Sequence, residues 1–374
     1  MAIFGSYFSK PEVSVTGIDI GSSAIKIVQL KKKNGQAILE TYGELALGPY
    51  AGGTVGQAVS LPGDKISQAI IDLMKEKEVN ITTNKCGISI PFSSSLMSVI
   101  EMPEVSPKQL AVMVPLEARK YIPVPVAEVM LDWSVIPKSE NRIETEPQTL
   151  PSQTETIAKP VPKIDVLVVA IHNDTIARYK DIVEKSQLDA GFFEIEIFST
   201  MRAVLEESLQ PVMIMDMGAA STKLYIVERG VIEASHTINR GAQDITSTIS
   251  NSLGITVEKA EMMKRDTGAS GEDKTLKDII ILTLDYIFAE ANHTLLSFEK
   301  KYNKAVSKVV LVGGGASLKG LAPLAEANFK TSVEAGNPFG KVVAPAFLET
   351  ILKETGPEFA VAVGLALRRL GEEQ

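Results

Sequence analysis

The chain has 374 residues, of which 45% are hydrophobic and 22% are charged, and its net charge is −8. This is the composition of a globular protein, and the length exceeds what one small core organises, so we expect two or more subdomains. The acidic balance argues against a nucleic-acid-binding face, and the single cysteine, Cys86, excludes internal disulfides and cysteine-rich metal sites.

The N-terminal residues 1–11 contain no long apolar stretch and no cleavage-site pattern, so we expect no secretory signal. The most apolar runs elsewhere, such as 166–171 and 279–284, are too short to span a bilayer. We therefore expect a soluble protein of the cytoplasm.

The clearest feature is an internal repeat, formed by segments 17–30 and 214–227. Each segment is an apolar run, an Asp-x-Gly turn with small residues, and a second β-prone run, which predicts a β-hairpin. The two copies place the same residue types at the same spacing: Asp19, Gly21 and Lys26, then Asp216, Gly218 and Lys223. A hairpin that begins each half of the chain predicts an α/β protein with two similar lobes facing each other.

Between the two copies, short apolar runs predict strands, and capped or amphipathic stretches predict helices. We expect strands at 85–90, 97–102, 129–136 and 165–171, and helices at 106–120 and 173–186. Residues 137–163 are rich in Pro, Ser, Thr, Gln and Glu, so we expect a mobile loop there. The alternating run 193–197 fits a strand with Glu194 and Glu196 on its solvent face.

After the second copy, apolar residues recur at helical spacing in several segments. We expect helices at 242–253, 256–264, 276–301 and 358–370, the last with Gly364 in its interior. A buried strand at 308–312 ends in the glycine-rich turn 313–317.

The two turns have the chemistry to bind a phosphate chain. A tight turn of small residues offers several backbone N–H groups at once and lets phosphate oxygens approach closely. The candidate residues in the first turn are Gly21, Ser22 and Ser23, and those in the second are Gly218, Ala219, Ala220, Ser221 and Thr222. The aspartate ahead of each turn, Asp19 or Asp216, is expected to hold Mg²⁺ largely through water, because Mg²⁺ keeps several of its waters.

Each of these features has a simpler interpretation. One Asp-x-Gly-Ser sequence alone is an ordinary β-turn, but two copies in the same register favour phosphate binding. Lys26 and Lys223 lie on the returning strands, where they either touch phosphate or face solvent. The cluster Gly313, Gly314, Gly315 and Ser317 follows a buried strand, a place where a base or ribose can lie on bare backbone.

These elements, in this order, resemble the actin/Hsp70/sugar-kinase superfamily, with phosphate motifs at 19–26 and 216–222 and an adenosine motif at 313–317. The resemblance implies an actin-like (ribonuclease H-like), two-lobed α/β ATPase fold that binds ATP and Mg²⁺. Residues 260–264 are similar to the Ala-Glu-x-x-Lys helix of bacterial actins and FtsA, which implies that Glu261 and Lys264 approach the ribose and adenine. A helical ion pair between them is an equally good interpretation. Gly241 completes the expected nucleotide-binding set.

In the middle of the chain the resemblance is to one particular family of this superfamily. Residues 117–125 are similar to the Glu-Ala-x-x-Tyr-Ile-Pro-x-Pro pattern of the PilM family of type IV pilus assembly, and segments 17–23 and 359–368 match its opening and closing motifs. This implies an ATP-binding adaptor at the inner membrane, with an FtsA-type subdomain 1C. It also implies a groove between subdomains 1A and 1C for the N-terminal cytoplasmic peptide of the membrane protein PilN, with 117–125 at its rim. Packing of the subdomain by Tyr121, Ile122 and Pro123 is an equal alternative.

The resemblance also implies how the chain is divided into subdomains and which partners it has. We expect subdomain 1A at 13–84 and 187–210, 1C at 85–186, 2A at 211–241 and 306–374, and 2B at 242–305. FtsA ends in an amphipathic membrane helix, whereas this sequence ends in a polar segment after Leu370. We therefore expect membrane association only through the partner, with other pilus assembly proteins as further partners and no nucleic acid.

Two other functions are compatible with the motifs. A small-molecule kinase of the same superfamily needs a base near the acceptor hydroxyl, and the candidates are Glu194 and Glu196. Neither is placed convincingly as a base, so we expect ATP hydrolysis to be slow or absent. A polymerising actin or an Hsp70-like chaperone is the other alternative, against which the 1C-like block argues.

Overall fold

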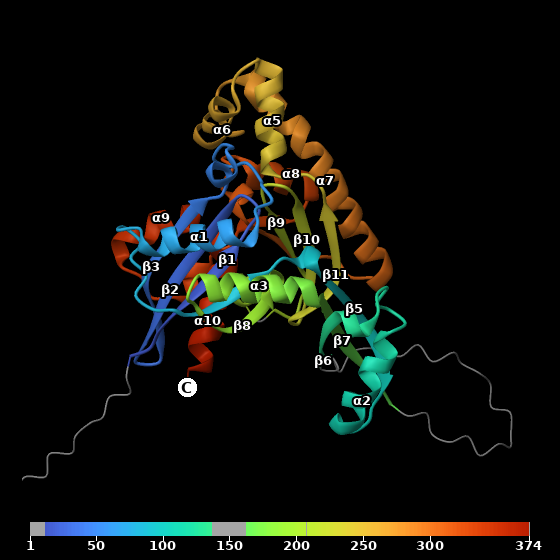
Figure 1. Cartoon of the computed structure of the whole chain (residues 1–374). Coiled ribbons are helices and arrows are strands. Elements are labelled where there is room, and N and C mark those ends of the chain that lie inside the picture. The colour runs from blue at the N-terminus through green and yellow to red at the C-terminus, as the bar shows by residue number, and fades with distance from the viewer. Residues whose placement is uncertain (1–11, 137–161, 207, 374) are drawn as a thin grey trace, which may run out of the picture. The chain divides into compact units, whose positions relative to one another are not determined.

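The computed structural model describes residues 12–136, 162–206 and 208–373 (Figure 1). They form two compact units, which we treat separately. The main unit comprises Met1–Pro91 and Asp181–Gln374, and the inserted unit comprises Phe92–Lys180. The loop expected at 137–163 lies, except for its last two residues, outside the described part of the chain, as do residues 1–11.

The first lobe of the main unit is built on a five-stranded sheet in the order β3-β2-β1-β4-β8. The sheet pairs β1 antiparallel to β2 and parallel to β4. Its strands are β1 (Ser14–Ile20), β2 (Ala24–Lys33), β3 (Gln36–Ala46), β4 (Lys85–Ile90) and β8 (Asp189–Ile195). Its helices are α1 (Gly63–Lys75), α4 (Glu196–Val204) and α10 (Ala360–Glu372).

The second lobe repeats this sheet order as β11-β10-β9-β12-β13. Its strands are β9 (Val212–Met217), β10 (Thr222–Glu228), β11 (Val231–Ile238), β12 (Lys308–Val312) and β13 (Ser332–Ala335). Its helices are α5 (Ala242–Leu253), α6 (Val257–Asp266), α7 (Lys274–Tyr302) and α8 (Leu321–Phe329). The predicted duplication of a hairpin in two similar lobes is therefore confirmed.

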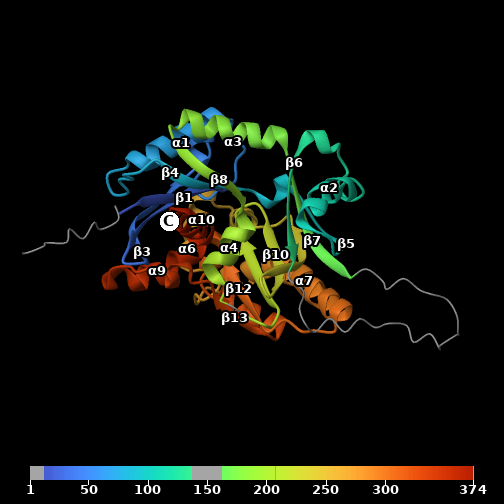
Figure 2. The ribbon, with the colours of Figure 1, turned by 90° about the horizontal axis from the view of Figure 1, so that it is seen from below.

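Helix α10 packs closely against β1 and α4, and Figure 2 shows it between these elements. Two glycines permit this approach. A Cβ at Gly17 would overlap the backbone of Ala362, and a Cβ at Gly364 would overlap the carbonyl group of Ser199. The absence of a side chain at both positions is what lets α10 lie this close to β1 and α4.

Helix α7 is long and apolar enough, by length and composition alone, to cross a membrane. One row of its side chains is instead buried in the core of the second lobe, together with residues of β9 and α5. The buried residues of this row include Leu276, Ile280, Leu284, Ile287 and Phe288. A long core helix passes the same test of length and composition, so we treat α7 as part of the lobe.

The interpretation of 193–197 as one strand with two solvent-facing acids is wrong. Strand β8 ends at Ile195, and α4 begins at Glu196. The exposed fractions of Glu194 and Glu196 are only 7% and 9%. Alternation along the chain could not reveal the cations that make this burial tolerable, because Arg202, Arg368 and Lys223 come from other elements.

The inserted unit contains a three-stranded antiparallel sheet in the order β5-β7-β6. Its elements are β5 (Ser95–Pro103), β6 (Val129–Ile136), β7 (Lys163–His172), α2 (Pro107–Ala118) and most of α3 (Asn173–Lys185). Helix α2 buries Leu110, Val114 and Ala118 against one face of the sheet. It begins with the predicted cap, because Ser106 and Gln109 form a capping box.

Candidate functional site

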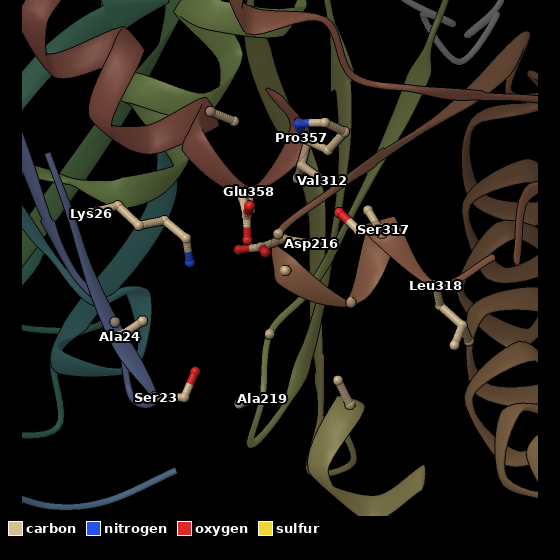
Figure 3. Close-up of a pocket in the computed structure, with 18 of the residues that line it drawn as sticks. Ser23, Ala24, Lys26, Asp216, Ala219, Val312, Ser317, Leu318, Pro357 and Glu358 are labelled. Carbon is tan, nitrogen blue, oxygen red and sulfur yellow. The ribbon is translucent and has the colours of Figure 1, made fainter. Parts of the chain in front are cut away.

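The main unit contains a cavity of about 730 Å³ between the two hairpins. The turn after β1 lies on one side and the turn after β9 lies on the other, and Figure 3 shows Ser23 and Ala219 at these two positions. The short helices η4 (Gly314–Ser317) and η7 (Gly356–Phe359) and helix α6 complete the wall. The structure thus brings together segments from both ends of the chain.

The two turns have the same geometry. The N–H of Gly21 donates to the carbonyl oxygen of Ala24 at 3.0 Å, and the N–H of Gly218 donates to that of Ser221 at 3.0 Å. The register also matches, because Asp19 pairs with Lys26 across the first hairpin and Asp216 pairs with Lys223 across the second. Within the described part of the chain, the N–H groups at the tips of the turns donate to no protein acceptor: Ser22, Ser23, Ala219 and Ala220.

The glycine cluster after β12 is required by close contacts. Gly313 has φ = +83°, and a Cβ there would overlap the carboxylate of Asp216. A Cβ at Gly315 would overlap the side chain of Met217. Bare backbone at these positions therefore lets η4 lie against the end of β9 and line the cavity.

The two predicted metal-binding aspartates both line the cavity. The carboxylate of Asp19 accepts a hydrogen bond from Ser89 Oγ at 2.8 Å. Burial raises the pKa of Asp19 to about 6, although the cation of Lys26 opposes the shift. Burial likewise raises the pKa of Asp216, and Lys223 again opposes the shift. Burial thus opposes the charged form of both carboxylates, and the neighbouring lysines favour it.

Neither lysine of the hairpins faces bulk solvent. The exposed fractions of Lys26 and Lys223 are 12% and 17%, and both line the cavity. Lys26 Nζ lies 3.4 Å from Glu44 Oε1, and Lys223 Nζ lies 2.7 Å from Glu196 Oε1. Of the two predicted orientations, the one toward the cavity is observed, and Figure 3 shows it for Lys26.

The residues of the Ala-Glu-x-x-Lys segment form the predicted helical ion pair. Lys264 Nζ lies 2.6 Å from Glu261 Oε2, which also accepts a hydrogen bond from Thr246. The other carboxylate oxygen, Oε1, accepts from Arg265 Nε at 2.7 Å. Both Glu261 and Lys264 also line the cavity, so an ion pair and a position at the site occur together. Contact with ribose or adenine stays a prediction.

Two of the predicted residues lie outside the cavity lining. Thr222 is buried and donates its hydroxyl to the carbonyl oxygen of Arg240. Gly241 precedes α5, and a Cβ there would overlap the backbone of the second turn. The remaining predicted residues all line the cavity: Asp19, Gly21, Ser22, Ser23, Lys26, Asp216, Gly218, Ala219, Ala220, Ser221, Glu261, Lys264, Gly313, Gly314, Gly315 and Ser317.

Sequence reasoning missed several charged residues of the site. Glu358 in η7 lines the cavity, and burial, together with the charge of Glu44, raises its pKa to about 7. The register of β2 with β3 places Glu44 opposite Lys26, a signal that was available in principle. Glu358 has no such signal, because only the packing of the C-terminal segment brings it to the cavity. Other residues missed in the lining include Gly56, Thr200, Arg265, Lys319 and Glu354.

Comparisons with known proteins agree on the fold. A solved structure, "PilM-PilN type IV pilus biogenesis complex", is 25% identical, covers 96% of this chain and 99% of that chain, and has a TM-score of 0.75. EutJ of Carboxydothermus hydrogenoformans is 14% identical with a TM-score of 0.54, covering 96% of this chain and 90% of that chain. MreB 5 of Spiroplasma citri bound to AMPPNP is 13% identical with a TM-score of 0.50, covering 97% and 98%. The predicted actin-like α/β fold is confirmed.

Comparisons of sequence identify the family. The cell division protein FtsA of Agrobacterium fabrum is 22% identical over 231 residues, 54% of this chain and 51% of that protein. The chain thus spans about half the length of the curated relatives it matches. The sequence model described as "Type IV pilus assembly protein PilM" matches residues 17–370, nearly the whole chain. The chain therefore belongs to the PilM family of type IV pilus assembly proteins.

Proposed function

We propose that the chain binds Mg²⁺–ATP between its two hairpin turns and acts as an adaptor that holds the N-terminal cytoplasmic peptide of inner-membrane PilN. The observation that carries the nucleotide part is the pair of turns with matching geometry on opposite sides of one cavity. In this proposal the protein works at the cytoplasmic side of the inner membrane and reaches the membrane through PilN.

The turns fit a phosphate chain. Their tips offer backbone N–H groups that are not used within the described protein, at Ser22 and Ser23 on one side and Ala219 and Ala220 on the other. Because phosphate oxygens are strong acceptors, donors from two sides fix both the position and the orientation of the chain. Lys26 and Lys223 add positive charge at the base of each turn.

The site also fits Mg²⁺ held mainly through water. Among the described residues there is no group of three or more His, Cys, Asp and Glu side chains that could hold a metal by itself. Asp19 and Asp216 would each orient waters of the ion, and the phosphates would supply its other ligands. When bound, the ion supplies positive charge that balances the negative charge of the phosphates. The same charge favours the ionised form of both carboxylates and so opposes the rise in their pKa.

The adenosine would lie at the other end of the cavity. The backbone of the 313–317 turn forms one wall, and Lys264 and Leu318 line the same cavity. A flat base packs well on bare backbone and an apolar side chain. In this arrangement Glu261, held by its ion pair, is the candidate for contact with the ribose.

The inserted unit has side chains suited to holding a peptide. Several large apolar residues are exposed on α2, directly after it and on β6: Val112, Leu116, Tyr121 and Met130. A short peptide gains affinity from a few such anchors, so these residues are candidates for contact with PilN. The solved PilM–PilN complex that the fold resembles supports the choice of partner.

A small-molecule kinase is the second candidate, because Glu196 lines the cavity as a base would have to. However, its Oε1 lies 2.7 Å from Lys223 Nζ, so the carboxylate is already engaged by a buried cation and is not positioned to accept a proton from an acceptor hydroxyl. We therefore propose slow or absent turnover.

The test combines a binding assay with a turnover assay. The N-terminal cytoplasmic peptide of PilN from the same genome is titrated into the protein with and without Mg²⁺–ATP, with a scrambled peptide beside it. We expect the native peptide to bind and the scrambled peptide not to bind. We also expect negligible phosphoryl transfer to sugars or small acids. Leu116→Ser is expected to weaken binding at least about tenfold (~1.4 kcal/mol), and Leu209→Ser, at a still more exposed site on the main unit, is the control. Fast phosphorylation of a small molecule would reject the adaptor.

A further inference from the structure

Residues 47–60, which we name the clasp, connect β3 to α1 in the first lobe. Both ends of the clasp are tied to the first turn. The N–H of Leu47 donates to the carbonyl oxygen of Ser23 at 2.8 Å, and the N–H of Val59 donates to that of Ser22 at 2.9 Å. The clasp therefore begins and ends on the residues predicted to hold phosphate.

The C-terminal part of the clasp contacts the second lobe. The N–H of Ala58 donates to Gln243 Oε1 at 3.1 Å, and Gln243 lies in the first turn of α5. The backbone N–H of the same Gln243 donates to the carbonyl oxygen of Ala219 at 3.0 Å. One continuous path of hydrogen bonds thus joins the first phosphate turn, through the clasp and Gln243, to the second.

A second contact lies beside this path, where Gly56 meets Glu261. A Cβ built on Gly56 would lie 2.7 Å from Glu261 Oε1, and both residues line the cavity. The carboxylate is not free to retreat, because Lys264, Thr246 and Arg265 all donate to it. The contact therefore tolerates glycine alone at position 56.

The clasp has the character of a segment that can move as a unit. It is braced internally by hydrogen bonds, such as the N–H of Gly53 to the carbonyl oxygen of Gly48 at 2.8 Å. Most of its residues are half-buried or exposed, and it meets the second lobe at Gly56 and Ala58. Few buried contacts mean a low free energy of local opening.

We propose that residues 47–60 are a lobe-to-lobe clasp beside the ribose end of the cavity, and that their release from Gln243 and Glu261 controls entry and exit of nucleotide. This rests on the proposed binding of nucleotide in the same cavity. Because the clasp ties the two turns together, the lobes separate only after it opens. A closed clasp retains nucleotide and an open one releases it.

The chain offers a matched pair of variants for the test. Gly56 and Gly52 both lie in the clasp at positive φ, +84° and +74°, so alanine strains the backbone similarly at either position. A Cβ at Gly52 meets no atom within 4 Å, whereas a Cβ at Gly56 meets Glu261. The difference between Gly56→Ala and Gly52→Ala therefore isolates the contact with the second lobe.

The measurement is the dissociation rate of N-methylanthraniloyl-ATP with Mg²⁺, followed by displacement with unlabelled ATP in the full-length protein. We expect Gly56→Ala to raise the rate about tenfold, which corresponds to ~1.4 kcal/mol, and Gly52→Ala to change it less than about twofold. Gln243→Ala removes the acceptor for Ala58 and is expected to raise the rate about threefold, so the test does not depend on one variant. Adding Gly56→Ala to a Glu261→Ala background should change nothing further.

The outcomes separate the two proposals. If the wild-type protein binds the labelled nucleotide but Gly56→Ala and Gln243→Ala both release it at the rate of Gly52→Ala, the clasp proposal is overturned and the nucleotide proposal stands. If the wild-type protein binds no labelled nucleotide, both are overturned. Faster release in Gly56→Ala and Gln243→Ala, with the control unchanged, supports the clasp.

Discussion

The ammonium nitrogen of Lys223 lies 2.7 Å from Oε1 of Glu196 and joins the two lobes across the cavity. Lys223 belongs to β10 of the second lobe, and Glu196 begins α4 of the first. Burial alone lowers the pKa of Lys223, but the charges of Glu196 and Asp216 outweigh it and raise that pKa above its usual value. The ion pair is therefore formed at neutral pH.

The first prediction concerns this ion pair. Lys223→Met leaves the buried carboxylate of Glu196 without the cation at 2.7 Å, so we expect the free energy of unfolding to fall by about 3 kcal/mol. Urea unfolding checks the value. The control is Lys308→Met, which breaks an exposed pair with Glu334 and should cost less than about 1 kcal/mol. Equal losses of unfolding free energy in the two variants would show that the inter-lobe pair stabilises the fold no more than an exposed pair does.

The second prediction concerns the two aspartates. Asp19→Ala and Asp216→Ala each remove a carboxylate that would orient waters of Mg²⁺, so we expect Mg²⁺–ATP affinity to fall at least about tenfold (~1.4 kcal/mol) while the protein still folds. Calorimetric titration with and without Mg²⁺ measures the loss. Asp285→Ala, at an exposed position on α7, is the control. Wild-type affinity in either site variant would show that the assignment of the site is wrong.

The third prediction compares two glycines of one helix. Gly364→Ala forces a methyl group into the carbonyl of Ser199, so we expect a loss of about 3 kcal/mol in the free energy of unfolding. Gly371→Ala meets open space near the C-terminal end of the same helix α10, where alanine is favoured over glycine by at most about 1 kcal/mol. Thermal unfolding should therefore shift in opposite directions. A similar shift in both variants would contradict the close packing of α10.

The fourth prediction concerns pH. Burial and Glu44 raise the pKa of Glu358 to about 7 from the ordinary 4.5, so between these values the unfolded chain ionises before the folded one. Stability from this group is thus greatest below pH 4.5, falls as the pH rises to about 7, and is level above that. Glu358→Gln removes the cost of ionisation, so we expect this variant to be more stable than wild type at pH 8, on the order of 1 kcal/mol, with a smaller gain at pH 5.

Urea unfolding at both pH values measures the gain, and Glu326→Gln at an exposed position serves as the control. A gain at pH 5 equal to or larger than that at pH 8 would contradict the raised pKa of Glu358.

Local pattern was enough to predict most elements of the fold. The strands at 85–90, 129–136 and 308–312 and the helix at 242–253 have the predicted bounds, because each has a clear period and a clear stop. The repeated Asp-x-Gly turns predicted a tertiary arrangement as well as secondary-structure elements. Since equal spacing in two hairpins implies equal register, the sequence also located the two sides of the cavity.

Features that depend on distant partners could not be predicted in the same way. Glu194 is buried because Arg202 of α4 and Arg368 of α10 pair with it. The sequence around position 194 does not indicate which cations will pair with it. Glu358 enters the cavity through the packing of the C-terminal segment. The contact of Gly56 with Glu261 joins two lobes. A single glycine in a glycine-rich stretch does not indicate which distant residue it will contact.

The most direct test of the nucleotide site is a crystal structure of the protein grown with Mg²⁺ and AMPPNP. We predict that the phosphate oxygens lie within hydrogen-bond distance of N–H groups of both turns, at Ser22 or Ser23 on one side and Ala219 or Ala220 on the other. A nucleotide bound outside this cavity, or one whose phosphates contact only one of the two turns, would contradict the proposal.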